Sequence, residues 1–287
     1  MTEPATGPED TEPEPRMIEL AAQRQARILD EVQRAGGVRV SDLTRVLGVS
    51  DMTVRRDLKT MARQGLVAKV HGGATATFGG PSTEEPGFEV KSVRNPQEKQ
   101  AIAARMAQLV QPASAIALTA GTTTWTVARY LVDVPQLTVV TNSLRVAEVL
   151  QQQQRSDRTV VLTGGVRTPS DALVGPVAVS TIRSLNVDLV IMGVHGVDAR
   201  AGLTTPNLLE AETNRAFREA TRRLAVVADH SKWGVVGLSQ IGALTEVDIL
   251  VTDDGLDGSA QAALSDLVGE LIIARRDGGR TGAWHDP

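Results

Sequence analysis

Glycine, hydroxyl and amide residues gather directly after several short apolar runs in the sequence. The run SAIALT is followed by Gly121, Thr122, Thr123 and Thr124. A glycine that permits a tight turn, followed by threonines that open a helix, presents backbone N–H groups and hydroxyls to a bound anion. This segment is therefore a candidate phosphate site, although glycine-threonine turns are also ordinary connections between a strand and a helix.

Other polar residues follow the later apolar runs. Glu210 could accept hydrogen bonds from sugar hydroxyls or simply start a helix, and Lys232 could pair with a phosphate or a carbonyl while Asp229 orients it. We predict a site for a phosphorylated, polyhydroxylated small molecule. Its remaining candidate residues are Asn142, Ser143, Gly164, Gly165, Arg167 and Asp198.

The elements that must position these residues form an alternating pattern. Seven short, continuously apolar runs are separated by amphipathic segments of helical period, such as residues 97–112 and 208–223. Continuous apolarity predicts strands that are buried on both faces, hence an α/β fold with a mainly parallel sheet covered by helices. The predicted strands are residues 114–119, 137–141, 158–164, 187–193, 224–229, 248–253 and 270–274. In such sheets, ligands bind beyond the carboxyl ends of the strands.

A second group of chemically active residues lies on one predicted helix near the N-terminus. In residues 50–65, Val54, Leu58 and Met61 recur at helical spacing and predict a buried stripe. The opposite face is cationic or hydrogen-bonding, which suits the major groove of DNA. Asp57 falls on the core side, so we expect it to be a structural partner of a nearby base or amide.

Two further helices, residues 17–35 and 41–48, precede this one, and a β-branched run at 66–77 predicts a hairpin wing. In the second helix, Leu43, Val46 and Leu47 are expected to form an apolar stripe. The pattern is a winged helix-turn-helix. Its predicted DNA-binding residues are Ser50, Met52, Thr53, Arg55, Arg56, Lys59, Arg63, Lys69 and His71.

The charge distribution agrees with this interpretation. The whole chain has 287 residues and a net charge of -4, but residues 16–71 carry eleven Lys/Arg against six Asp/Glu. Local basic charge is what attracts a phosphate backbone, although a solvated charged surface would have the same composition. Residues 1–15 carry five acids and no base.

Length and composition predict two domains in a cytoplasmic protein. There is no cysteine, no apolar run long enough to cross a bilayer and no secretory signal. We predict a disordered acidic leader at 1–16, a DNA-binding domain at 17–76, a linker at 77–96 whose tail docks, a sensor domain at 97–275 and a tail at 276–287.

The N-terminal part resembles the DNA-binding domain of the DeoR family of transcriptional regulators. The matching residues are Arg24, Ile28 and Val32 in the first helix, Ser50 with Thr53 to Leu58 in the third, and Gly65 to Val67 with Val70 to Ala74 in the wing. So many positions in register are much more specific than a bare helix-turn-helix match.

The larger part resembles the sensor domain of the same family, which is similar to ribose-phosphate isomerases, glucosamine-phosphate isomerases and coenzyme A transferases. The matching residues include Gly121 to Thr123, Thr141 to Ser143, Gly164-Gly165, Gly193, Gly196, Asp198, Gly202 to Thr204, Glu210-Ala211, Asp229 and Ser231-Lys232. The resemblance implies a phosphorylated sugar or related intermediate as effector. Where the family usually has an acidic residue, this sequence has Thr119, which puts the usual ligand set in doubt.

The alternative function is a sugar-phosphate isomerase with an appended DNA-binding domain, in which Asp198, Glu210 and Lys232 would act on a carbon acid. No metal-ligand spacing, nucleotide-binding motif or catalytic triad supports an enzyme, and His195 is more simply a loop histidine than a ligand. We therefore predict a non-enzymatic repressor of carbohydrate-metabolism genes without metal or cofactor. It would bind double-stranded operator DNA as a homo-oligomer, a dimer or tetramer, and release it when the effector binds.

Overall fold

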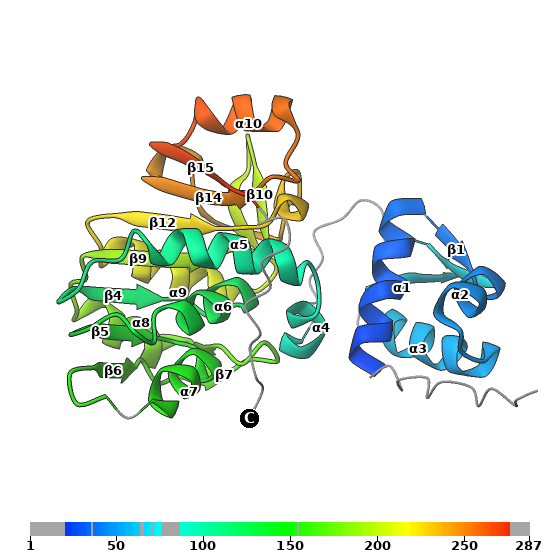
Figure 1. Ribbon diagram of the computed structural model, residues 1–287, viewed down its shortest axis with the longest axis horizontal. Coiled ribbons are helices and arrows are strands. Elements are labelled where there is room, and N and C mark those ends of the chain that lie inside the picture. Colours follow the sequence, from blue (N-terminus) through cyan, green and yellow to red (C-terminus); the bar gives the residue numbers. More distant parts are fainter. Residues whose placement is uncertain are drawn as a thin grey trace, which may run out of the picture.

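The computed structural model describes residues 21–275 apart from 36, 64–65, 71, 76–86 and 154. Figure 1 shows two units, a small one built from the first three helices and a larger one built around a long sheet. No helix in the described part of the chain has both the length and the apolar character needed to span a bilayer.

The small unit contains three helices and a three-stranded antiparallel sheet. The helices are α1 (Ala21–Ala35), α2 (Val40–Leu47) and α3 (Asp51–Arg63), and the strands are β1 (Gly37–Arg39), β2 (Ala68–Val70) and β3 (Gly73–Thr75), in the order β1-β3-β2. The strands β2 and β3 form the wing predicted from the sequence.

The core of the small unit confirms most of the predicted apolar stripes. Val54, Leu58 and Met61 of α3 are fully buried and pack in one cluster with Leu43 and with side chains of α1. The stripe predicted for α2 is wrong at Val46, whose side chain is 46% exposed. A helix of eight residues has only about two turns, too few for the apolar pattern to fix which side faces inward, and here Val40 takes the inner position instead.

A short connection joins the small unit to the sheet. Residues 87–96, predicted as part of the linker, contain α4 (Phe88–Ser92) and the first residue of α5 (Pro96–Ala107). Phe88 makes an edge-to-face contact with Trp125, with 5.6 Å between ring centroids. This contact attaches α4 to the larger unit.

The larger unit is centred on a parallel sheet of seven strands. They are β4 (Ala115–Leu118), β5 (Thr138–Thr141), β6 (Thr159–Leu162), β9 (Leu189–Gly193), β12 (Leu224–Val227), β14 (Ile249–Asp253) and β15 (Glu270–Ala274). Their order is β15-β14-β12-β9-β4-β5-β6, with every neighbouring pair parallel. All seven predicted strands and the parallel α/β fold are confirmed.

Helices cover both faces of this sheet (Figure 1). One apolar cluster joins the sheet to α5, α6 (Thr122–Tyr130) and α7 (Leu144–Gln152), and the other joins it to α8 (Pro176–Arg183), α9 (Leu208–Glu219) and α10 (Gly258–Ser265). Successive side chains of β4 alternate between the two clusters, with Ala117 in one and Ile116 and Leu118 in the other. Burial on both faces explains the continuous apolar runs.

Shorter strands form two further small sheets. The strands β10 (Gly196–Asp198), β11 (Gly202–Thr205) and β13 (Ser239–Gly242) form an antiparallel sheet, and β7 (Val166–Arg167) pairs with β8 (Leu173–Val174). Two single-turn 3₁₀ helices, η1 (His230–Lys232) and η2 (Leu244–Glu246), follow β12 and β13.

Candidate functional site

A cavity of about 590 Å³ lies at the carboxyl ends of β4, β9 and β12. The chain runs from β4 to β5 and β6 on one side and later from β9 to β12, β14 and β15 on the other, so the strand order reverses between β4 and β9. A reversal of this kind leaves a crevice between the loops that leave in opposite directions. The cavity is therefore in the position where parallel α/β sheets bind ligands.

The loop after β4 forms one wall of the cavity. Gly121 has φ 153°, a conformation that favours glycine, and a Cβ at this position would lie 3.2 Å from the Thr124 hydroxyl oxygen. This turn brings Thr122 and Thr123, the first residues of α6, to the cavity wall. The positive end of the helix dipole thus faces the cavity.

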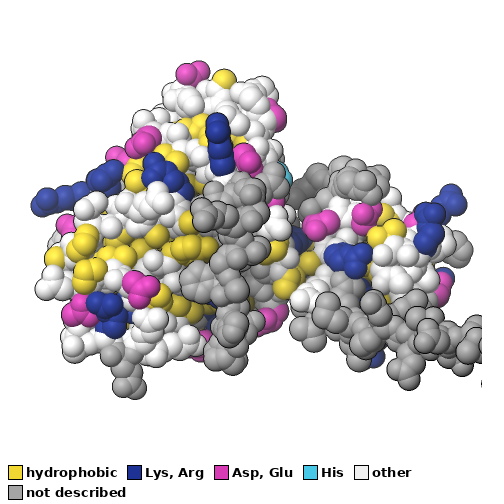
Figure 2. All heavy atoms as spheres, in the orientation of Figure 1, with side chains coloured by type: hydrophobic (Ala, Val, Ile, Leu, Met, Phe, Trp, Pro, Cys, Tyr) yellow, Lys and Arg dark blue, Asp and Glu magenta, His cyan; other side chains and the backbone are white. Residues whose placement is uncertain are grey.

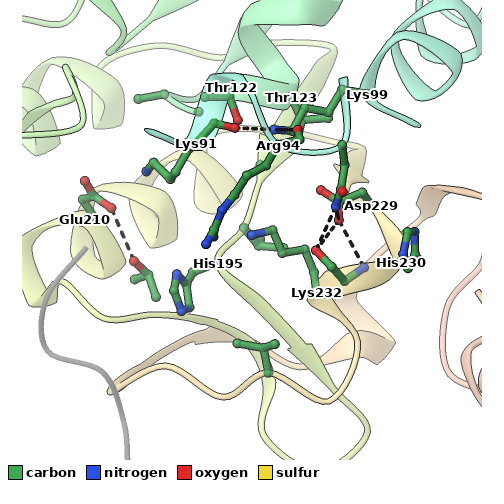
Figure 3. A pocket seen from close by; sticks show the side chains of 18 of the residues that line it. Lys91, Arg94, Lys99, Thr122, Thr123, His195, Glu210, Asp229, His230 and Lys232 are labelled. Atoms are coloured by element: carbon green, nitrogen blue, oxygen red, sulfur yellow. Dashed lines mark hydrogen bonds between the residues drawn. The ribbon is translucent and has the colours of Figure 1, made fainter. Parts of the chain in front are cut away.

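Arg94 extends into the cavity from the connection between α4 and α5, as Figure 3 shows. Its Nε and Nη2 atoms are buried and have no hydrogen-bond partner among the described residues. Burial lowers the pKa of the guanidinium, an effect that the carboxylates of Asp30 and Asp229 oppose. Arginine nonetheless remains charged in proteins, so this side chain is a buried cation with two nitrogens that the described part of the chain leaves unsatisfied.

The backbone next to Arg94 is held in an unusual conformation. Asn95 has φ 46°, and its side-chain amide donates a hydrogen bond of 2.9 Å to a carboxylate oxygen of Asp229. Asparagine tolerates the left-handed region better than most residues. The turn at Asn95 directs Arg94 toward the strand ends.

Lys99 holds the same turn in place through hydrogen bonds to its backbone. Its side chain is only 4% exposed, and its ammonium group donates to the carbonyls of Lys91 and Arg94 at 2.5 and 2.6 Å. Burial lowers the pKa of Lys99 to about 8, against the opposing effect of Asp229. Lys99 thus fixes the backbone that carries Arg94.

Asp229 follows β12 and lies opposite this turn (Figure 3). Burial alone would raise its pKa, but Lys232, the Ser231 hydroxyl, Lys99 and the Asn95 amide together hold the pKa below its usual value. The carboxylate is therefore ionised and committed to neighbouring groups of the protein.

Glu210 lines another side of the cavity. It accepts hydrogen bonds from the hydroxyls of Ser170 at 2.8 Å and of Thr168 and Thr205 at 3.3 Å. His195, after β9, and His230 of η1 also line the cavity, and His230 Nδ1 lies 2.7 Å from a carboxylate oxygen of Asp253. The cavity thus combines a cationic region with hydroxyl, carboxylate and imidazole groups that can bind a polar ligand.

Six of the thirteen predicted effector residues meet in this cavity. They are Gly121, Thr122, Thr123, Glu210, Asp229 and Lys232. The other seven lie elsewhere: Thr124, Asn142, Ser143, Gly164, Gly165, Arg167 and Asp198 are not among the residues that line it.

Most of these seven have structural contacts instead. Thr124 donates to the Gly121 carbonyl, Asn142 joins Ala120 to Leu173, and Ser143 caps α7. A Cβ on Gly165 would overlap the backbone of β8.

The two charged members of this group also pair locally. Arg167 pairs with Asp171, and Asp198 accepts hydrogen bonds from the backbone amides of Arg200 and Ala201.

Three cationic residues that line the cavity were not predicted from the sequence: Lys91, Arg94 and Lys99. A signal for them was present: three cations precede or open the amphipathic segment at 97–112. The glycine and proline content of the preceding residues favoured a linker, so these cations were not assigned to a site.

Thr119, the departure from the family pattern, is fully buried. Its hydroxyl oxygen accepts a hydrogen bond of 3.1 Å from the backbone amide of Gly193, which joins the loops after β4 and β9. Thr119 thus supplies a hydrogen-bond acceptor at this position, but it does not supply the negative charge of a carboxylate.

The outer face of α3 carries the predicted DNA-binding side chains. Met52 is 81% exposed, and Arg56 and Lys59 are exposed as well. Ser50 accepts a hydrogen bond from the Thr53 amide at 3.2 Å, as expected of a residue that caps this helix. Arg55 is exposed and forms an ion pair of 2.5 Å with Asp51.

The remaining predicted DNA contacts are only partly described. Arg63 and Lys69 belong to α3 and β2, and His71 lies outside the described residues. Asp57 is 4% exposed and pairs with Arg24 of α1, which confirms that it faces the core and has a basic partner. Figure 2 shows Lys and Arg side chains on the visible surface of the small unit, including its side away from the large one.

Comparison with known proteins gives matches to both units. Residues 24–77 match the DeoR-like helix-turn-helix domain, and residues 94–254 match the DeoR C-terminal sensor domain. The uncharacterised HTH-type transcriptional regulator YgbI of Escherichia coli K12 is 36% identical over 90% of this chain and 100% of its own length. The glycerol-3-phosphate regulon repressor of the same organism is 31% identical over 85% of this chain and 95% of its own length.

Among solved structures, ribose 5-phosphate isomerase A of Methanocaldococcus jannaschii matches with a TM-score of 0.36 and 16% identity, over 48% of this chain and 55% of the isomerase chain.

Proposed function

This chain belongs to the DeoR family of DNA-binding transcriptional regulators, and on that basis we propose that it represses carbohydrate-metabolism genes until a phosphorylated sugar or related metabolite binds its cavity. The observation that carries the proposal is the guanidinium of Arg94, which extends into the cavity and has two buried nitrogen atoms without a partner among the described residues.

A buried cation with unsatisfied nitrogens is costly to keep, because its desolvation is not offset by hydrogen bonds. A phosphate ester would offset it, since its oxygens accept the paired N–H groups of an arginine. The start of α6 would supply backbone amides to the same group. Lys91 and Lys232 bring further positive charge to the cavity.

The cavity also offers groups for the rest of such a ligand. Glu210 and Asn214 lie on its wall, together with His195 and Thr205, and can bind hydroxyls. Its volume of about 590 Å³ suits a small metabolite. The name of the relative that represses a glycerol-3-phosphate regulon agrees with a phosphate ester as effector.

The DNA side of the proposal rests on α3. Arg56 and Lys59 are exposed on the face opposite the buried stripe, where they can contact base edges or phosphates of a major groove. We propose that the protein acts in the cytoplasm as a dimer or tetramer, because two recognition helices on a palindromic site bind far more tightly than one. Sedimentation equilibrium of the full chain tests the oligomer.

The isomerase alternative is not favoured. The proteins similar to this chain are transcriptional regulators and repressors, and its matching domains are a helix-turn-helix and a sensor domain. Asp198, one of the three residues that would have to act on a substrate, does not line the cavity.

Calorimetric titration of the full chain with glycerol 3-phosphate and a panel of sugar phosphates tests the effector proposal. We expect one or more of these esters to bind to the wild type, and Arg94→Met to weaken binding by about a hundredfold, as expected for the loss of a charge-assisted anchor. Arg105→Met is the matched control, because Arg105 lies on α5 and does not line the cavity. Equal binding to wild type and Arg94→Met would rule out the proposed anchor.

A mobility-shift assay with the chain's own upstream DNA tests the regulatory proposal. We expect a complex that the bound ester dissociates, and loss of the complex when Arg56 and Lys59 are both replaced by Ala. A complex that these two substitutions leave intact would contradict the proposed DNA face.

A further inference from the structure

The cavity is not made by the sensor domain alone. Asp30, on the third turn of α1 in the DNA-binding unit, also lines it. Helix α1 contacts α4, the helix that carries Lys91 and leads into Arg94. The two units therefore meet at the cavity.

Two carboxylates act on the Arg94 guanidinium, and the effect of Asp30 is larger than that of Asp229. Asp229 is buried and already hydrogen-bonded to Asn95 and Ser231. Asp30, in contrast, is exposed and lines the same cavity, and within the described part of the chain it forms no hydrogen bond or ion pair with Arg94, so its attraction for the guanidinium acts at longer range. It is the carboxylate that can move away.

Charges of both signs surround Asp30. Partial burial raises the pKa of its carboxyl group, Glu31 and Glu98 add to this rise, and Arg94 and Lys99 oppose it. A phosphate ester at Arg94 would bring up to about two further negative charges to this position. Repulsion between Asp30 and the ester would then act across the contact between α1 and α4.

We propose that Asp30 is the internal counter-ion of Arg94 and that the phosphate group of the effector replaces it, which separates α1 from α4 and changes the placement of the DNA-binding unit. This inference rests on the proposed function, because it requires a phosphate ester at Arg94. It assigns to the DNA-binding unit a residue that senses the ligand directly.

The thermodynamic consequence has a definite sign. An effector can shift the protein between two arrangements only by binding one of them more tightly. Repulsion by Asp30 weakens effector binding in the arrangement with α1 docked and leaves it unchanged in the undocked one. Asp30→Asn removes that difference, so we expect tighter effector binding and a smaller effect of the effector on DNA affinity.

The test uses the full chain, which contains no native cysteine and so accepts two engineered labels. Gln23→Cys on α1 and Gln97→Cys on α5 are both exposed and lie on the two sides of the contact. Spin-label distances are measured without ligand, with inorganic phosphate and with glycerol 3-phosphate. Calorimetry under the same conditions shows which probe is bound.

We expect bound ligand to lengthen the distance in the wild type. In Asp30→Asn the ligand should bind about tenfold more tightly than in the wild type. Bound ligand should change the affinity for operator DNA by less than about threefold in this variant, but by about tenfold or more in the wild type. Asp42→Asn on α2 is the matched control, because it removes the same charge from the DNA-binding unit at an exposed position outside the cavity. It should keep the wild-type response.

The outcomes separate this inference from the proposed function. If calorimetry shows ligand binding that depends on Arg94 while Asp30→Asn keeps the full effect of ligand on DNA affinity, the counter-ion inference is wrong and the phosphate site stands. If neither probe nor any sugar phosphate binds to the wild type, both are wrong.

Discussion

The Nε atom of Arg24 lies 2.6 Å from a carboxylate oxygen of Asp57, and this ion pair joins α1 to the inner face of α3. The two side chains are 13% and 6% exposed. A second nitrogen of Arg24 lies 3.3 Å from the other carboxylate oxygen, and the Gln25 amide donates to that oxygen as well. The pair sets the orientation of the helix that carries the predicted DNA contacts.

Arg24→Met should therefore destabilise the small unit. It leaves the Asp57 carboxylate buried without its cation, and the loss of one partner of a buried pair costs about 3 kcal/mol or more. Urea denaturation of the full chain measures the loss. The double variant Arg24→Met/Asp57→Leu should recover most of it, and a single variant as stable as the wild type would show that the pair is not structural.

Arg56→Ala should weaken DNA binding without changing stability. Its side chain is exposed in the free protein, so its removal affects the complex alone. We expect a loss of about 1–3 kcal/mol in operator binding if Arg56 reads a base edge, and a salt dependence reduced by roughly one unit if it contacts a phosphate. Fluorescence anisotropy at several salt concentrations separates the two, with Arg45→Ala on α2 as an exposed control.

Arg94→Met should stabilise the ligand-free protein while it weakens effector binding by about a hundredfold. A buried guanidinium with unpartnered nitrogens costs free energy in the folded state, and an apolar side chain of similar length does not. An increase of about 1–2 kcal/mol in the free energy of unfolding is the expected size. Lower stability in this variant would mean that the attraction of Asp30 and Asp229 for the guanidinium outweighs the cost of its burial.

Lys99 should give the protein a stability that rises with pH. Its pKa is about 8 in the folded protein and 10.5 in an unfolded chain, so between these values the unfolded state binds more protons and the free energy of unfolding increases with pH. Between about pH 7.5 and about pH 9.5 the contribution is about 2 kcal/mol. Denaturation at both pH values, for wild type and Lys99→Met, isolates it because the other groups titrate alike in both proteins. An identical pH dependence would contradict a depressed pKa.

The sheet could be predicted from the sequence because its strands are buried on both faces. Each run, such as residues 187–193, is apolar without interruption, and in a chain of alternating elements that pattern is typical of a strand covered on both sides. Short elements with mixed composition left no comparable signal. Helix α8 and the antiparallel strands β10, β11 and β13 were therefore not predicted.

The site could be predicted only in part, because the sequence does not state the order of strands in the sheet. The loops after β5 and β6, which hold Asn142 and Gly164, share their composition with the loop after β4. Of these three loops, the one after β4 faces the reversal of strand order next to β9. Arg94 was missed for a different reason, since its position depends on a turn at Asn95 that pattern analysis does not show.

The ion pair between Arg55 and Asp51 has a consequence for how the protein searches a chromosome. Both side chains are more than half exposed, and the guanidinium is held by a carboxylate one turn earlier in α3. If Arg55 contacts DNA as predicted, nonspecific DNA would compete with that carboxylate for the arginine, and we expect this to weaken nonspecific binding. A target that presents a guanine in the right place compensates for the exchange with two directed hydrogen bonds. If Arg55 contacts DNA as predicted, we expect the pair to reduce the time that the protein spends at the many nonspecific sites that outnumber its target.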